Sequence, residues 1–201
     1  MCPGGQVIPS VSEEGGLCVN GMSQHARDGI NANSAVVVQV RQEDVPNGWG
    51  GGIAFQRQME RAAFAAGGGG YTAPIQTFGD FLVGKRTRQL GQVKPSYPRE
   101  TVGCDLTDVL PGFVSQGIRE GVLAFGRKLN GFDRADALLT GVETRTSAPL
   151  RILRDETGQC ISLRGLYPAG EGAGYAGGIV SAAVDGLRVA GHIIDEYAPI
   201  L

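Results

Sequence analysis

Five glycines between residues 170 and 178 separate an apolar segment from a long amphipathic one. The stretch reads GEGAGYAGG and holds one carboxylate, Glu171. Glycines let a ligand approach the backbone closely, and the N-terminus of a following helix offers unpaired N–H groups and a partial positive charge. The pattern therefore predicts a strand, a turn and a helix that could bind an anionic or electron-rich group. Tight strand-to-helix packing would use the same glycines, so both interpretations stay open.

A second candidate group is Arg145, Thr146 and Ser147, which brings a fixed cation and two hydroxyls into three consecutive residues. These residues could hold an acidic substrate, and they are also consistent with an ordinary exposed turn. The only histidines are His25 and His192, and no catalytic triad can be assembled from them. The four cysteines form no C-x-x-C pair, so the sequence predicts neither a zinc site nor a dithiol motif.

Three segments show helical periodicity. Residues 53–66 carry apolar side chains at helical spacing and end at the four glycines 67–70. A second helix is predicted from near Pro111 to near Asn130, and the final helix over about 178–196. The apolar stripe of the second helix is Val114, Ile118, Gly121, Phe125 and Leu129, and the side chains expected to be buried in the final helix are Val180, Ala183, Leu187 and Ile194.

Strand-like composition appears in short pieces at both ends of the chain. The residues Leu17 to Asn20 and Ser34 to Arg41 are predicted strands, the latter largely buried because it is rich in β-branched residues. Residues 137–144 and 150–155 are β-like, and the apolar residues 165–169 are the strand expected before the glycine-rich turn. Strands at both ends of the chain around helical segments predict an α/β fold.

Composition and charge narrow the function classes. The formal net charge is −2, without the basic run that binds nucleic acid, so we expect no nucleic-acid partner. No stretch approaches 18 consecutive apolar residues, and the N-terminal residues lack the basic and apolar regions of a signal peptide. We therefore expect a cytoplasmic protein without membrane contact.

The stretch GLYPAGEGAGYAGGIVSAAVDGLRVA resembles the C-terminal, flavin-contacting segment of FAD-dependent oxidoreductases with a two-part, Rossmann-like FAD domain. It is most similar to that of a family of bacterial FAD-dependent dehydrogenases of uncharacterised substrate. Four further segments are similar in order and character to the latter part of those proteins, so the resemblance covers nearly all 201 residues. They read MCPGGQVIPSVSEEGGLCVNGMSQHARDGINANSAVVVQV, IAFQRQMERAAF, DFLVGKRTRQLGQVKPSYPR and GVETRTSAPLRILRD.

The resemblance implies roles for the glycine-rich turn. Glu171 would accept hydrogen bonds from flavin ribityl hydroxyls, although a solvated loop carboxylate is the alternative. The backbone near Gly177 and Gly178 would face the N1 and C2 carbonyl edge of the flavin, which becomes negative on reduction, so the helix N-terminus would stabilise the reduced state. The implied cofactor-binding residues are Gly170, Glu171, Gly172, Ala176, Gly177, Gly178 and Ile179, and the implied substrate-binding residues are Arg145, Thr146 and Ser147.

The resemblance also implies a three-part organisation. Residues 1–44 and 137–201 would be Rossmann-like pieces of the FAD domain, and they would flank an inserted, mixed α+β substrate region over 45–136. The family's first βαβ unit, which carries the glycine fingerprint for the FAD pyrophosphate, has no counterpart in this sequence. We therefore expect the chain to bind FAD weakly or not at all by itself.

The resemblance leaves two possible functions open. The first is the C-terminal part of an FAD-dependent oxidoreductase that transfers a hydride between an unknown small-molecule substrate and the flavin. Its partner would be a missing N-terminal FAD-binding half or a second copy of the chain. The alternative is a cofactor-free remnant or a ligand-binding module without redox activity.

Overall fold

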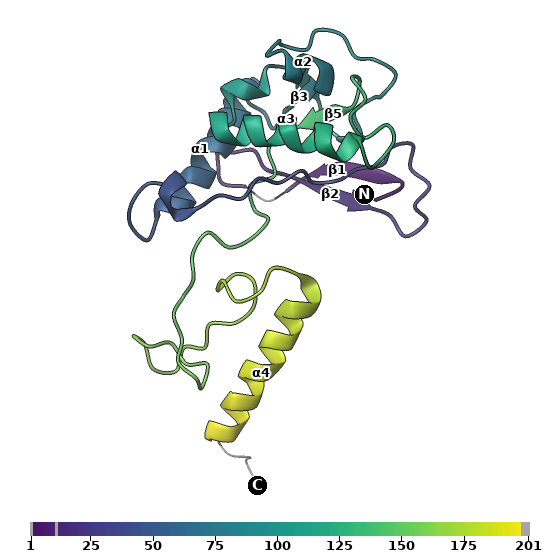
Figure 1. The fold of residues 1–201 in the computed structure, drawn as a ribbon. Coiled ribbons are helices and arrows are strands. Elements are labelled where there is room, and N and C mark those ends of the chain that lie inside the picture. The colour runs from purple at the N-terminus through teal and green to yellow at the C-terminus, as the bar shows by residue number, and fades with distance from the viewer. Residues whose placement is uncertain (1, 11, 198–201) are drawn as a thin grey trace. The chain divides into compact units, whose positions relative to one another are not determined.

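The computed structural model describes residues 2–10 and 12–197, and the chain divides into two units. The first unit consists of the residues up to Asp44 together with Phe55–Thr144. The second consists of Val45–Ala54 together with the residues from Arg145 onward. The described strands all belong to the first unit, and four α-helices accompany them in the described chain (Figure 1). The fold is mixed α/β, as the sequence predicted.

The first unit contains two small sheets. Strands β1 (Gly5–Pro9) and β2 (Val19–Ser23) pair antiparallel with each other. In the other sheet the central strand β3 (Ala73–Thr77) runs parallel to β4 (Thr101–Gly103) and antiparallel to β5 (Leu138–Thr140). All five residues of β3 are buried, so this strand forms the centre of the first unit.

Three helices follow or precede the central strand in sequence. They are α1 (Gly51–Ala66), α2 (Phe78–Leu82) and α3 (Gly112–Gly126). The predictions of α1 and of a helix beginning near Pro111 are confirmed. The predicted apolar stripe of α3 is only partly right, because Val114 is buried while Phe125 is 45% exposed.

Aromatic side chains of α2 form the middle of the apolar core. Phe78 and Phe81 have no exposed surface, and Ile75 of β3 and Leu17 are nearly as buried. Burying an aromatic or branched side chain contributes about 1.5–3 kcal/mol. The short helix α2 is therefore held mainly by tertiary packing, since five residues are too few for a stable isolated helix.

The buried strand predicted over residues 34–41 does not form. These residues are irregular, and Val37 is 60% exposed. Asn33, just before them, pairs with Cys2 through a single bridge, and no described strand continues this pairing. β-branched residues favour a strand only where a neighbouring strand and a packed face are available. The strand predicted at Leu17 to Asn20 appears two residues later as β2, and its partner β1 was not predicted.

The second unit contains the helix α4 (Ile179–Tyr197), close to the predicted bounds. The strands predicted over 150–155 and 165–169 are absent, and one isolated bridge joins Arg154 to Cys160. Because β1 and β2 pair only with each other, no sheet in the described chain joins them to residues 145–197. The assignment of three parts to one FAD domain stays a prediction. No helix among the described residues has both the length and the apolar character to cross a bilayer.

Candidate functional site

Two glycines of the turn are required by the fold of the second unit itself. Gly170 and Gly174 have φ angles of +69° and +83°, a region that glycine adopts without strain. A Cβ atom at Gly174 would also lie 2.5 Å from the carbonyl oxygen of Leu150. Turn geometry and close packing within the second unit explain these two positions.

The other three glycines have no such explanation. A Cβ atom at Gly172 or Gly177 would meet nothing within 4 Å, and one at Gly178 would meet only Ser181 Oγ, at 3.8 Å. None of the three has a positive φ. The backbone at these positions therefore faces open space, which a side chain would fill and which a closely approaching ligand would need.

Unpaired amides lie at the same place. The N–H groups of Gly177, Gly178 and Ile179 donate to no acceptor among the described residues, while the Gly178 carbonyl accepts the first helical hydrogen bond from Ala182, at 2.9 Å. The start of an α-helix leaves such donors unsatisfied and carries about half a positive charge. This backbone can therefore bind an electron-rich edge.

Glu171 supplies a carboxylate near these amides in the sequence. The side chain is half-buried and makes no hydrogen bond or ion pair within the described chain. Its backbone carbonyl accepts from the Gly174 amide at 2.9 Å, which fixes the turn around it. Both carboxylate oxygens are thus available as acceptors for hydroxyl groups of a ligand.

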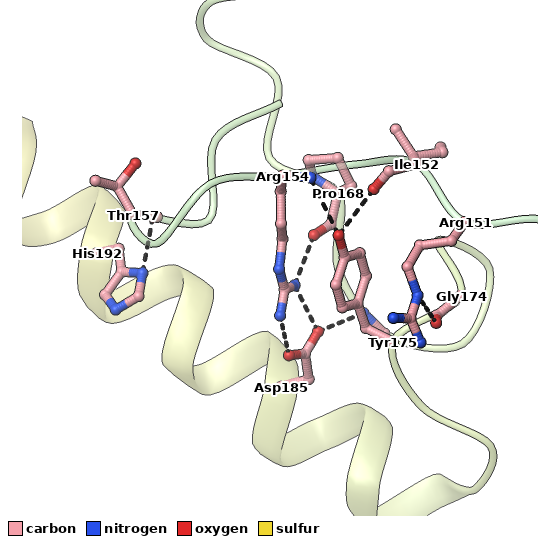
Figure 2. Close-up of polar contacts among 10 residues, drawn as sticks. Arg151, Ile152, Arg154, Thr157, Pro168, Gly174, Tyr175, Asp185 and His192 are labelled. Atoms are coloured by element: carbon pink, nitrogen blue, oxygen red, sulfur yellow. Dashed lines mark hydrogen bonds and ion pairs between the residues drawn. The ribbon is translucent and has the colours of Figure 1, made fainter. Parts of the chain in front are cut away.

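A buried ion pair holds the turn against α4. Arg154 Nη2 donates to Asp185 Oδ1 at 2.6 Å and Nη1 donates to Oδ2 at 2.9 Å (Figure 2). Arg154 Nη1 also donates to the Pro168 carbonyl at 2.8 Å, and the Gly170 amide donates to Asp185 Oδ2 at 2.8 Å. The Asp185 carboxylate of α4 therefore ties the helix to the start of the turn and to the irregular segment containing Arg154.

Tyr175 packs between two guanidinium groups. Its ring centroid lies 3.6 Å from the Arg154 Cζ and 4.9 Å from the Arg151 Cζ, with the ring between them in Figure 2. The hydroxyl accepts from the Arg154 amide and donates to the Ile152 carbonyl, each at 3.1 Å. Stacking and hydrogen bonds together fix the second half of the turn.

The prediction of which face of α4 is buried is wrong. Leu187 is 74% exposed, and Val180, Ala183 and Ile194 are exposed as well. The buried residues are Asp185 and Val189, because the helix turns its charged side toward Arg154. Hydrophobic periodicity cannot detect a helix that buries a carboxylate, so neither partner of the ion pair was found from the sequence.

Asp185 should titrate at unusually low pH. Hydrogen bonds from Arg154 and from the Gly170 amide lower its carboxyl pKa from 3.8 to about 2. Because the pKa of Asp185 is lowered in the folded state, the ionised carboxylate stabilises the folded state. This stabilisation is complete above about pH 4 and is lost as the pH falls through 2. Carbon-13 NMR of the aspartate carboxyls should show this midpoint near 2, and a midpoint near 3.8 would contradict the buried pair.

The candidate substrate residues lie in the second unit, as the turn does. Arg145, Thr146 and Ser147 are exposed and belong to an irregular segment. Thr146 and Ser147 have no hydrogen-bond partner among the described residues. Their role as substrate ligands stays a prediction. His192 is half-buried, and its Nδ1 lies 2.7 Å from the Thr157 carbonyl.

A family model described as "FAD-dependent protein, C-terminal domain-like" matches residues 1–146. The chain belongs to this family. A protein from Clostridium beijerinckii (strain ATCC 51743 / NCIMB 8052), described as an uncharacterized protein, is 51% identical over 198 residues. That match covers 98% of this chain and 37% of the relative. The family match ends before the glycine-rich turn, whereas the match to the relative extends over nearly the whole chain.

Proposed function

We propose that this chain is the C-terminal part of a cytoplasmic FAD-dependent oxidoreductase and that its glycine-rich turn contacts the flavin. The observation that carries the proposal is the coincidence of open space, free amides and a free carboxylate in one turn. Gly177, Gly178 and Ile179 offer the amides, and Glu171 offers the carboxylate. The chain belongs to a family of FAD-dependent proteins, which indicates FAD as the cofactor that these amides and this carboxylate would bind.

The donor and acceptor types of the turn fit a flavin. Amides at a helix N-terminus would donate to the N1 and C2 carbonyl edge and favour the negative charge of the reduced ring. Glu171 would accept from ribityl hydroxyls. FAD itself supplies the hydride chemistry when bound. Gly170, Gly172 and Ala176 would shape the backbone around these groups.

The remainder of the FAD site would come from polypeptide that corresponds to the part of the longer Clostridium protein outside the match. The exposed apolar face of α4 supports this, because Val180, Leu187 and Ile194 are 66–76% exposed on one helix. A large apolar helix face in water is unfavourable and typical of a docking surface. We propose that the part of the longer protein outside the match covers this face.

The substrate would be a small molecule near Arg145, Thr146 and Ser147. An arginine and two hydroxyls in an exposed segment suit an acidic or polar group. The competing function is a cofactor-free binding module. The visible spectrum distinguishes these two functions. The protein to test is a fusion in which this chain replaces the matched part of the Clostridium relative. The fusion should purify with flavin absorbance if the chain belongs to a flavoprotein, whereas a cofactor-free module would give a colourless protein.

Glu171→Ala in that fusion should weaken FAD binding about 10- to 100-fold. The change removes charge-assisted hydrogen bonds of about 1.5–3 kcal/mol. Fluorescence quenching of added FAD measures the dissociation constant. Glu156→Ala is the matched control, because Glu156 is an exposed carboxylate of the same unit. Equal affinities of the two variants would contradict the ribityl role of Glu171.

A further inference from the structure

The segment after α2 lines a pocket with positive charge. The pocket has a volume of about 560 Å³ and is lined by Asp80, Lys85, Arg86, Arg88 and Gln89. Three cations and one carboxylate give this lining a formal charge of +2. The volume lies within the range of small-molecule sites, roughly 300–1,000 Å³. The pocket belongs to the first unit and is independent of the proposed flavin site in the second.

Buried polar side chains hold the backbone of this segment in place. Thr87, 3% exposed, accepts from the Thr77 amide at 2.9 Å, and its own amide donates to the Cys104 carbonyl at 3.2 Å. Gln76 has no exposed surface and donates to the Lys85 carbonyl at 2.8 Å. The residues that carry the cations are therefore fixed to the central sheet at two points.

The acidic groups nearby are already engaged. Asp80 Oδ2 accepts from the hydroxyls of Thr87, at 2.6 Å, and Thr77, at 2.9 Å. Asp105 accepts from the amide and the hydroxyl of Thr107 and from Gln76 Nε2. Neither carboxylate forms an ion pair with a pocket cation within the described chain.

The cations are left with spare donors. Arg86 Nε donates a hydrogen bond to the Gly103 carbonyl at 2.8 Å. The side chains of Lys85 and Arg88 are exposed and make no hydrogen bond or ion pair with a described residue. Like charges held close together repel, and a bound anion removes this repulsion while filling the free donors.

We propose that this pocket binds a small molecule with at least two negative charges, through Lys85 and Arg88. A doubly charged carboxylate or phosphate compound would complement the lining, and guanidinium groups recognise both by paired hydrogen bonds. Arg86 shapes the pocket, because its bond to Gly103 fixes it to β4. The proposal assigns a ligand class to the first unit and does not depend on flavin binding.

Calorimetric titration of the 201-residue chain with pyrophosphate and with citrate, at constant ionic strength, tests the proposal. We expect one equivalent of at least one of them to bind, and the result shows whether phosphate or carboxylate is preferred. The double variant Lys85→Gln/Arg88→Gln should raise the dissociation constant about tenfold or more, and Arg88→Gln alone should raise it less.

The matched control is Arg127→Gln/Lys128→Gln, which removes the same charge from two exposed residues just after α3. We expect it to change the dissociation constant less than about twofold. Circular dichroism verifies that each variant is folded, and Arg88→Gln serves alone if the double variant is not. The absence of saturable binding by both anions, or equal weakening by the pocket and control variants, would overturn the proposal.

Discussion

Asp185→Ala should unfold the second unit while the first unit stays folded. The change leaves the Arg154 guanidinium buried without its carboxylate and removes the acceptor of the Gly170 amide. Breaking a buried ion pair by deleting one partner costs about 3–5 kcal/mol. The second unit has no sheet among its described residues to compensate, so α4 should lose most of its protection against hydrogen exchange.

Hydrogen exchange followed by mass spectrometry locates the effect. Peptides from α4 and from the turn should exchange rapidly in the variant, and peptides from β3 should exchange as in the unchanged protein. Asp195→Ala is the control, because Asp195 is exposed on the same helix and has no ion-pair partner among the described residues. If both variants exchange alike, the Arg154–Asp185 pair does not hold the unit together.

Local sequence patterns were sufficient for the long helices. The apolar spacing and the glycines 67–70 predicted α1, and the final periodic segment predicted α4 within one residue at each end. Strands were harder to predict. β5 lies within the β-like segment predicted over residues 137–144, whereas β3 and β4 were not predicted, because they are five and three residues long and depend on distant partners. Such pairing is set by tertiary contacts that a single segment does not contain.

The candidate site was predicted only in part, because the residues that position the turn also depend on tertiary contacts. The glycine-rich turn before α4 is visible in the sequence, and so is Glu171. The residues that position the turn, Arg154 and Asp185, are 31 residues apart, and their contact depends on which face of α4 is buried. Periodicity favoured the apolar face. The burial of the opposite, charged face shows that the helix packs within its own unit through an ion pair.

The chain by itself should bind FAD about a thousandfold more weakly than the fusion with the longer relative. The turn contacts only the flavin in our proposal, whereas a pyrophosphate and an adenosine normally contribute much of the binding energy through a separate glycine loop and helix. Losing about 4 kcal/mol of those contacts corresponds to a factor of about a thousand in the dissociation constant.

A titration of FAD into both proteins, followed by flavin fluorescence quenching, tests the central claim most directly. The claim is that this chain supplies the flavin-contacting turn to a site completed by other polypeptide. It predicts saturable binding by the fusion and little or no saturation of the 201-residue chain at the same concentrations. Tight, saturable binding by the chain alone, or no binding by the fusion, would contradict it.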